Sequence, residues 1–143
     1  MLKRFIKPVY AHCDVPCGIY ETNTALTAAL TCKVMTEKLE AADLSQNDKT
    51  DLNNFVREVT QKEIQAQIVK DQLYILWSDY FKPEHLDANP DLHNIIWNAV
   101  KQASEVKHII SLDAANNLLD QVKVIAKIFD ETGGNKKVED MLS

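Results

Sequence analysis

The chain has 143 residues, 45% of them hydrophobic and 26% charged, with a formal net charge of -5. This length suits one domain with a substantial core, and the composition is typical of a soluble protein with no membrane span. Nucleic acid is a poor partner for it, because phosphates require clustered Lys and Arg. The three cysteines do not form the dense framework of a small secreted domain, so we expect a cytoplasmic protein.

The first eleven residues, MLKRFIKPVYA, differ from the remainder because they contain Lys3, Arg4 and Lys7 and no acidic residue. A secretory signal needs about 7–15 apolar residues after its basic start, and here Lys7 and Pro8 interrupt the apolar stretch. Taken alone, this composition fits a frayed chain end. The segment that follows favours a leader that is removed.

Metal-binding atoms are concentrated in residues 12–20, HCDVPCGIY. The cysteine pair by itself has three other interpretations: a zinc half-site, a redox pair or two unrelated thiols. A structural zinc site lacks its second ligand pair here. Cleavage before His12 gives the segment a different chemistry.

A free amine on His12 and the amide nitrogen of Cys13 can bind one metal in a five-membered chelate ring, and the amide nitrogen forms a second ring with the Cys13 thiolate. Cys17 supplies a fourth donor if the chain doubles back, which Pro16 and Gly18 permit. Planar nitrogen and sulfur donors favour nickel(II) or copper(II).

Long helices follow this segment, since no Gly or Pro occurs between residues 19 and 82. The first helix is expected over residues 22–42, and the second is expected to be capped by Ser45 and to run to about residue 80 or 81. Apolar residues at helical spacing define one face of the first helix: Leu26, Leu30, Val34, Met35 and Leu39. The face of the second helix includes Leu52, Phe55, Val56, Val59, Ala66, Val69, Leu73, Leu76, Trp77 and Tyr80.

A third helix is expected from Asn89-Pro90, with the asparagine as cap and the proline at the first helical position. Ser111 is the expected cap of the last helix, which Gly133-Gly134 should end. Four amphipathic helices with short connections predict an all-α fold, an antiparallel up-down four-helix bundle with an N-terminal metal-binding hook. The expected organisation is a leader over residues 1–11, a hook over residues 12–20 and the bundle over residues 21–143.

Two motifs resemble a known family. HCDVPCGIY resembles the nickel hook of the nickel superoxide dismutases, and WSDYFKP at residues 77–83 resembles the second signature of that family. The similarity extends through the helical pattern to about Thr132. It implies an enzyme that converts superoxide to dioxygen and hydrogen peroxide while one nickel ion per subunit cycles between Ni(II) and Ni(III).

The resemblance also implies a ligand set. His12 would give its amine and an axial imidazole, Cys13 its amide nitrogen and thiolate, and Cys17 a second thiolate. Anionic donors of this kind stabilise the higher oxidation state, and ligand identity is a general means of tuning a redox potential. Zinc has no redox chemistry and would leave the site inert.

Four further residues match positions around the metal in that family. Tyr20 would restrict access to the open metal face and order water, and Tyr80 and Asp14 would lie beside it. Lys82 would attract the superoxide anion despite the net negative charge. The alternative for these residues is ordinary loop packing or a solvated charge.

Better-known members orient the axial imidazole with an acidic residue and an arginine, and counting from the two motifs places Ala28 and Gln65 at these positions. The family also implies a cis peptide before Pro16, a homohexamer and a maturation peptidase that removes the leader. The rival hypothesis is a non-catalytic helical-bundle protein that binds metal or senses thiols and keeps residues 1–11.

The remaining residues of possible chemical interest receive structural interpretations. His85, His93 and His108 have spacings that match no compact helical ligand pair, so we expect surface or loop histidines. Cys32 is expected to be a small, semi-buried apolar residue of the first helix. Trp97 is expected in packing or in a subunit interface.

Overall fold

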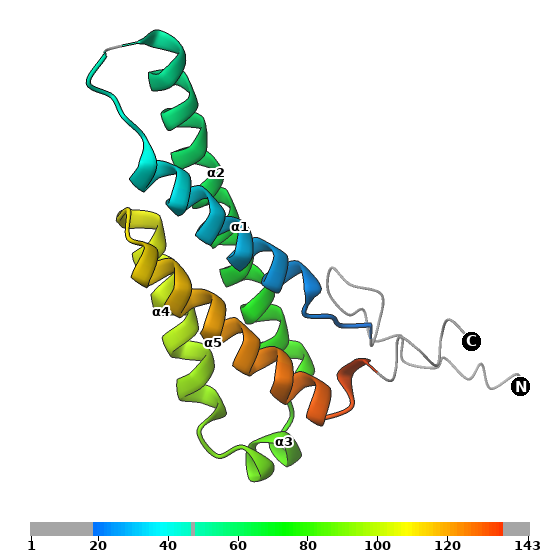
Figure 1. The fold of residues 1–143 in the computed structure, drawn as a ribbon. Helices are drawn as coiled ribbons and strands as arrows, with labels where there is room; N and C mark the ends of the chain where they lie inside the picture. Colours follow the sequence, from blue (N-terminus) through cyan, green and yellow to red (C-terminus); the bar gives the residue numbers. More distant parts are fainter. Residues whose placement is uncertain (1–18, 47, 136–143) are drawn as a thin grey trace, which may run out of the picture.

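The computed structural model describes residues 19–46 and 48–135, and every regular element in these ranges is helical. Four long helices, α1 (Asn23–Ala41), α2 (Lys49–Ile75), α4 (Leu92–His108) and α5 (Leu112–Glu131), run alternately up and down (Figure 1). Helices α1 and α4 each pack against both α2 and α5, so the four form a ring around one core. The predicted all-α, up-down four-helix bundle is confirmed.

Of the three predicted caps, Ser45, Asn89 and Ser111, only Ser111 is confirmed, and the side chain of Thr22 makes no capping hydrogen bond. Thr22 is the N-cap of α1, and the Ser111 side chain caps α5 by accepting from the backbone N–H of Ala114. The predicted Ser45 cap of α2 is wrong, because Asp48 accepts from the N–H groups of the first turn instead. Ser45 belongs to a separate local turn, in which its N–H is bonded to the carboxylate of Asp43.

The segment between α2 and α4 contains more structure than the sequence predicts. Helix α2 continues as a π-helical turn over Leu76–Tyr80, and a short helix α3 occupies Pro83–Ala88. Pro83 stands at the start of α3, where its missing N–H costs nothing. The expected start of the next helix at Asn89-Pro90 is wrong, since α4 begins at Leu92.

The buried face of α1 is not the predicted stripe of large residues. Leu30 and Val34 are exposed, whereas the core face carries mainly small side chains: Ala25, Ala28, Ala29, Cys32, Thr36 and Leu39. Small residues let the helix axes approach closely, and the larger side chains of α4 and α5 fill the space between them. Periodicity therefore identified the helix but assigned its buried face only in part, since Leu39 is buried and Leu26 packs against the core.

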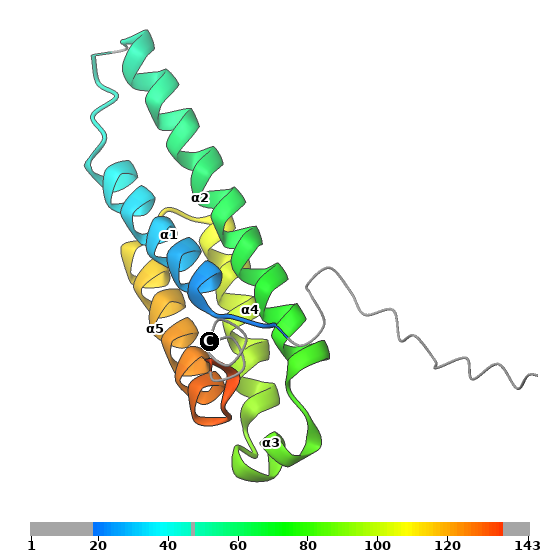
Figure 2. The ribbon, with the colours of Figure 1, turned by 90° about the vertical axis from the view of Figure 1, so that its right-hand side faces the viewer.

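The first part of α2 is also more exposed than predicted. Leu52 is 50% exposed and Val56 is 55% exposed, while Ala66, Val69 and Leu73 further along are buried. The start of α2 extends beyond the end of α4 and so does not pack against that helix, as Figures 1 and 2 show. The core lies around the second half of α2.

A buried lysine links α2 to the end of α4. Lys62 is 1% exposed, and its Nζ donates to the carbonyl oxygens of Val106, Lys107 (3.3 Å) and Ile109 (2.7 Å). The last carbonyls of a helix have no partner within it, and a cation there also interacts favourably with the helix dipole. Burial lowers the pKa of Lys62, but the three acceptors compensate for lost hydration. Lys62 therefore acts as a C-terminal cap of α4 supplied by another helix.

Replacing Lys62 with methionine is expected to lower the free energy of unfolding by about 1–3 kcal/mol, because charge-assisted hydrogen bonds are lost while apolar volume is kept. For a domain of this size that corresponds to a fall of roughly 3–9 °C in Tm, measurable by circular dichroism. Lys127→Met is the matched control, since Lys127 is exposed and forms only a surface ion pair with Glu131. Equal stability of the two variants would contradict the capping role.

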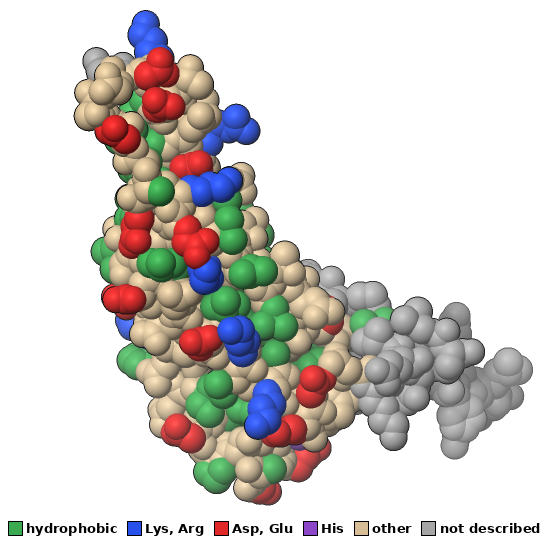
Figure 3. All heavy atoms as spheres, in the orientation of Figure 1, with side chains coloured by type: hydrophobic (Ala, Val, Ile, Leu, Met, Phe, Trp, Pro, Cys, Tyr) green, Lys and Arg blue, Asp and Glu red, His purple; other side chains and the backbone are tan. Residues whose placement is uncertain are grey.

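The surface carries mixed charge. On the face in Figure 3, acidic and basic side chains alternate with hydrophobic ones. Within residues 19–46 and 48–135, no helix has the length and apolar character needed to cross a membrane.

Candidate metal centre

The proposed metal ligands His12, Cys13 and Cys17 lie outside the described residues, as do Asp14 and the peptide before Pro16. These assignments therefore stay predictions. The structure does describe the part of the bundle to which residues 12–18 are joined, from Ile19 onward.

Tyr80 is the centre of an aromatic cluster at this end of the bundle. Its ring contacts the rings of Phe129 at a centroid distance of 4.5 Å, Phe81 at 5.0 Å, His85 at 5.5 Å and Tyr20 at 5.6 Å. The residues of the cluster come from the segment before α1, the π-helical turn and the residue after it, α3 and the end of α5. The structure thus brings Tyr20 and Tyr80 together, although 60 positions separate them in the sequence.

The hydroxyl of Tyr80 is hydrogen-bonded to the end of α5. It lies 2.8 Å from the Oγ1 of Thr132, which is itself within bonding distance of the carbonyl oxygens of Ile128 (3.0 Å) and Phe129 (2.9 Å). The Tyr80 hydroxyl also lies 3.5 Å from the carbonyl oxygen of Phe129, to which it can donate. Either hydroxyl can be the donor between Tyr80 and Thr132, and these bonds together anchor the Tyr80 hydroxyl to the end of α5.

The end of α5 holds its side of the cluster through two glycines. Gly133 ends the helix with φ +82°, a conformation that favours glycine, as predicted from the sequence. Gly134 lies directly against the Phe129 ring, where an added Cβ would come within 2.3 Å of it. The ring position of Phe129, and with it the packing of Tyr80, depends on a residue without a side chain.

The π-helical turn contains most of the second motif. The N–H of Phe81 bonds to the carbonyl oxygen of Leu76 at 2.9 Å, five residues earlier. Such a turn shifts the register of the side chains that follow, and π-turns occur frequently at functional sites. Here Leu76 is buried and Trp77 is 46% exposed, while Tyr80 packs against the core.

Lys82 and His85 stand on the outer side of the cluster. Lys82 is exposed and precedes α3 as its N-cap residue, as required of a cation that attracts an anion from solvent. His85 is only partly exposed, and its Nδ1 accepts the backbone N–H of Lys82 at 3.2 Å. The expectation of surface or loop histidines is confirmed for His93 and His108, which are exposed, whereas His85 is a partly exposed residue of the short helix α3.

Counting from the two motifs places Ala28 and Gln65 at the positions where better-known nickel superoxide dismutases orient the axial imidazole. The two residues differ in burial. Ala28 is 1% exposed in the core of α1 and has no polar atom in its side chain. Gln65 is partly exposed on α2. Ala28 therefore cannot hydrogen bond to an imidazole through its side chain.

Cys32 is unsuited to be a metal ligand. It is fully buried, more so than predicted, and its Sγ donates to the carbonyl oxygen of Lys62 at 3.5 Å. Burial raises the pKa of its thiol to about 11, an effect only partly offset by the nearby Lys62 charge. Metal binding requires the thiolate, so Cys32 is chemically quiet near neutral pH.

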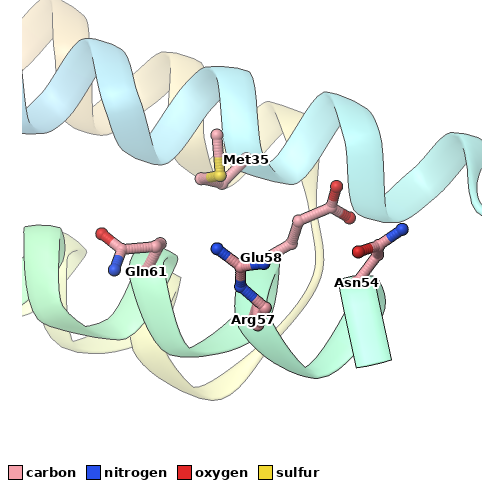
Figure 4. A pocket seen from close by; sticks show the side chains of 5 residues that line it. All are labelled: Met35, Asn54, Arg57, Glu58 and Gln61. Carbon is pink, nitrogen blue, oxygen red and sulfur yellow. The ribbon is translucent and has the colours of Figure 1, made fainter. Parts of the chain in front are cut away.

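The described residues contain other hollows, but these lack the chemistry of the cluster. One lies between α1 and α2 and is lined by Met35, Asn54, Arg57, Glu58 and Gln61 (Figure 4). Met35 is about three helical turns beyond the start of α1, and so well away from Tyr20. Among the described residues, no group of three or more His, Cys, Asp or Glu side chains is arranged to hold a metal ion.

Comparisons with known sequences agree with the two motifs. The family model described as nickel-containing superoxide dismutase matches residues 7–133. The chain is 39% identical over 135 residues to superoxide dismutase [Ni] of Streptomyces seoulensis, covering 92% of this chain and 98% of the relative. It is 36% identical, with the same coverage, to superoxide dismutase [Ni] of Streptomyces coelicolor.

Solved structures agree with the fold. A native nickel superoxide dismutase structure is 34% identical and superimposes with a TM-score of 0.74, covering 85% of this chain and 99% of that one. A structure with nickel ligation corresponding to the oxidised state is 38% identical with a TM-score of 0.74, covering 85% and 98%. The motifs, the bundle and these similarities together show that the chain belongs to the nickel-containing superoxide dismutase family.

Proposed function

We propose that this chain is the precursor of an enzyme that disproportionates superoxide at a nickel ion bound by His12, Cys13 and Cys17 after cleavage before His12. The observation that carries the proposal is the family match, which extends over residues 7–133 and so includes both the junction before His12 and the Tyr80 cluster. Curated relatives with this match are named superoxide dismutase [Ni].

The donor set fits nickel. Two thiolates, an amine and a deprotonated amide nitrogen are the planar nitrogen and sulfur donors that nickel(II) prefers. The third cysteine, Cys32, is buried with its thiol pKa raised, so the two thiolates are best supplied by Cys13 and Cys17. A nickel ion held by these donors would supply one-electron redox chemistry.

The residues around the ligands have separate tasks. Two superoxide anions and two protons give one dioxygen and one hydrogen peroxide, so the site must admit an anion and deliver protons. Lys82 is an exposed cation beside the cluster and favours the approach of superoxide over short distances. Tyr20 and Tyr80, whose rings are 5.6 Å apart, bring two phenols to the end of the bundle that adjoins residues 12–18.

Asp14 is proposed to lie beside the metal, although it falls outside the described residues. Its position one residue after Cys13 keeps its carboxylate close to the ligands. We assign residues 1–11 to the leader, residues 12–20 to the hook and residues 21–143 to the bundle.

Assembly into a homohexamer in the cytoplasm belongs to the same proposal. Tyr74, Trp77 and Trp97 line an apolar hollow between α2 and α4, and Trp97 is 61% exposed. Exposed aromatic surface of this kind is typical of protein interfaces. Trp97 does not pack in the core of its own chain, which leaves subunit contact as its proposed role.

The decisive test is to produce the full chain with nickel in cells that also contain the maturation peptidase. Intact mass, nickel content and superoxide consumption are then measured. The active fraction is expected to begin at His12 and to hold one nickel ion per subunit. Full-length protein with nickel-independent activity would contradict the proposal. Nickel-loaded protein without activity would favour the non-catalytic metal-binding alternative.

A further inference from the structure

His85 contacts three consecutive residues of the second motif. Its imidazole lies against the Tyr80 ring at a centroid distance of 5.5 Å and an interplanar angle of 23°, and meets the Phe81 ring edge-on at 6.0 Å and 87°. Its Nδ1 accepts the N–H of Lys82 at 3.2 Å. One side chain therefore links both candidate functional residues, Tyr80 and Lys82.

The hydrogen bond to Lys82 is a variant of a capping box. In the usual form, a Glu or Gln at the third helical position accepts the N–H of the N-cap residue. Here His85 takes that place, while its own N–H bonds to the carbonyl oxygen of Lys82 at 2.9 Å. To accept, Nδ1 must carry no proton, so the neutral ring holds its proton on Nε2. The two bonds fix the backbone that carries the Lys82 cation.

The stacking contact closes the outer side of Tyr80. Phe129 packs against Tyr80 from α5, Thr132 holds its hydroxyl, and Tyr20 contacts it from the segment before α1. Phe129 and Thr132 belong to the end of α5 and Tyr20 precedes α1, whereas His85 comes from α3, a helix of six residues with no buried residue. Without His85, the contact that joins α3 to the ring of Tyr80 is lost.

We propose that His85 is a positioning residue for the dismutase reaction, acting by holding the Tyr80 ring and the Lys82 backbone in one arrangement. This inference rests on the proposed function, because it takes Tyr80 and Lys82 to act on the substrate. His85 itself need not contact superoxide or the metal.

Three variants separate the two contacts. His85→Asn keeps an acceptor near the place of Nδ1 but loses the ring, His85→Phe keeps a ring but loses the acceptor, and His85→Ala loses both. His85→Ala is expected to lower kcat/KM about tenfold or more at unchanged nickel content, as outer residues of metal sites commonly do. His85→Asn and His85→Phe are each expected to have a kcat/KM between that of His85→Ala and that of the wild-type protein. His85→Asn is also expected to show the wild-type dependence of the rate on ionic strength.

His108→Ala is the matched control, since His108 is an exposed histidine at the end of α4 and lies outside both the Tyr80 cluster and the apolar hollow around Trp97. It should leave the rate and its salt dependence unchanged. A readout independent of activity is hydrogen exchange at the Lys82 amide in the full chain, which should accelerate in His85→Phe and His85→Ala but not in His85→Asn.

The outcomes distinguish this inference from the proposed function. Full wild-type kcat/KM and salt dependence in folded, nickel-loaded His85→Ala would overturn it, as would Lys82 exchange that is the same in all four proteins. If His85→Ala does not fold, the same criteria apply to His85→Phe, which also lacks the acceptor for the Lys82 N–H. An inactive nickel-loaded wild-type protein would instead refute the proposed function.

Discussion

Replacing Cys13 or Cys17 with serine is expected to reduce superoxide dismutase activity to that of the nickel-free protein. A serine hydroxyl stays protonated near neutral pH, so each change removes an anionic sulfur donor that nickel requires. The measurements are nickel per chain after purification and the rate of superoxide consumption. Both should fall together in the two variants.

Cys32→Ser is the matched control for these two changes. Cys32 is fully buried, and its Sγ donates to the carbonyl oxygen of Lys62, a bond that a serine hydroxyl can also make. The variant should therefore fold and retain about half or more of the wild-type rate, because a buried free cysteine acts mainly through packing. An equal loss of nickel and activity in folded Cys32→Ser would show that the ligand assignment is wrong.

Adding one residue before His12 in the processed protein is expected to abolish activity as well. The extra residue converts the His12 amine into an amide and moves the new amine out of the chelate ring with the Cys13 nitrogen. The imidazole and both thiolates stay in the chain, so the experiment isolates the contribution of the terminal amine. Nickel content and the absorption of the nickel–thiolate chromophore are measured beside the rate.

The corresponding control carries the same extra residue after Ser143, at the opposite terminus of the chain. It should match the processed wild-type protein in nickel content and rate. Full activity in the protein extended before His12 would mean that the amine is not a ligand, and the need for leader removal would then have another cause.

Local sequence was sufficient to locate the four long helices but not to assign all of their buried faces. The absence of Gly and Pro over residues 19–82 and the Ser111 and Gly133-Gly134 signals located the helices, because capping and helix breaking depend on neighbouring residues. The exposure of Leu30 and Val34 has a different origin. Which side of an amphipathic helix faces the core depends on the side chains of the other helices, and α4 and α5 supply the bulk that lets α1 contribute alanines.

Lys62 shows the same limit for a polar residue. A lysine within a helix predicts an exposed side chain, yet Lys62 is buried because the end of α4 presents unpaired carbonyl oxygens to it from 44 and more positions away. Nothing close to Lys62 in the sequence indicates these acceptors. Only the packing of α2 against α4 brings them together.

The sequence by itself determined the family, since HCDVPCGIY and WSDYFKP are contiguous motifs whose chemistry requires only near neighbours. It also determined the all-α bundle, through periodicity and capping. The tertiary structure alone decided that Tyr20, Tyr80, Phe129 and Thr132 meet at one end of the bundle and that His85 links Tyr80 to Lys82. The physical reason is that a π-turn and a short α3 set the direction of these side chains, and both depend on packing between helices distant in the sequence.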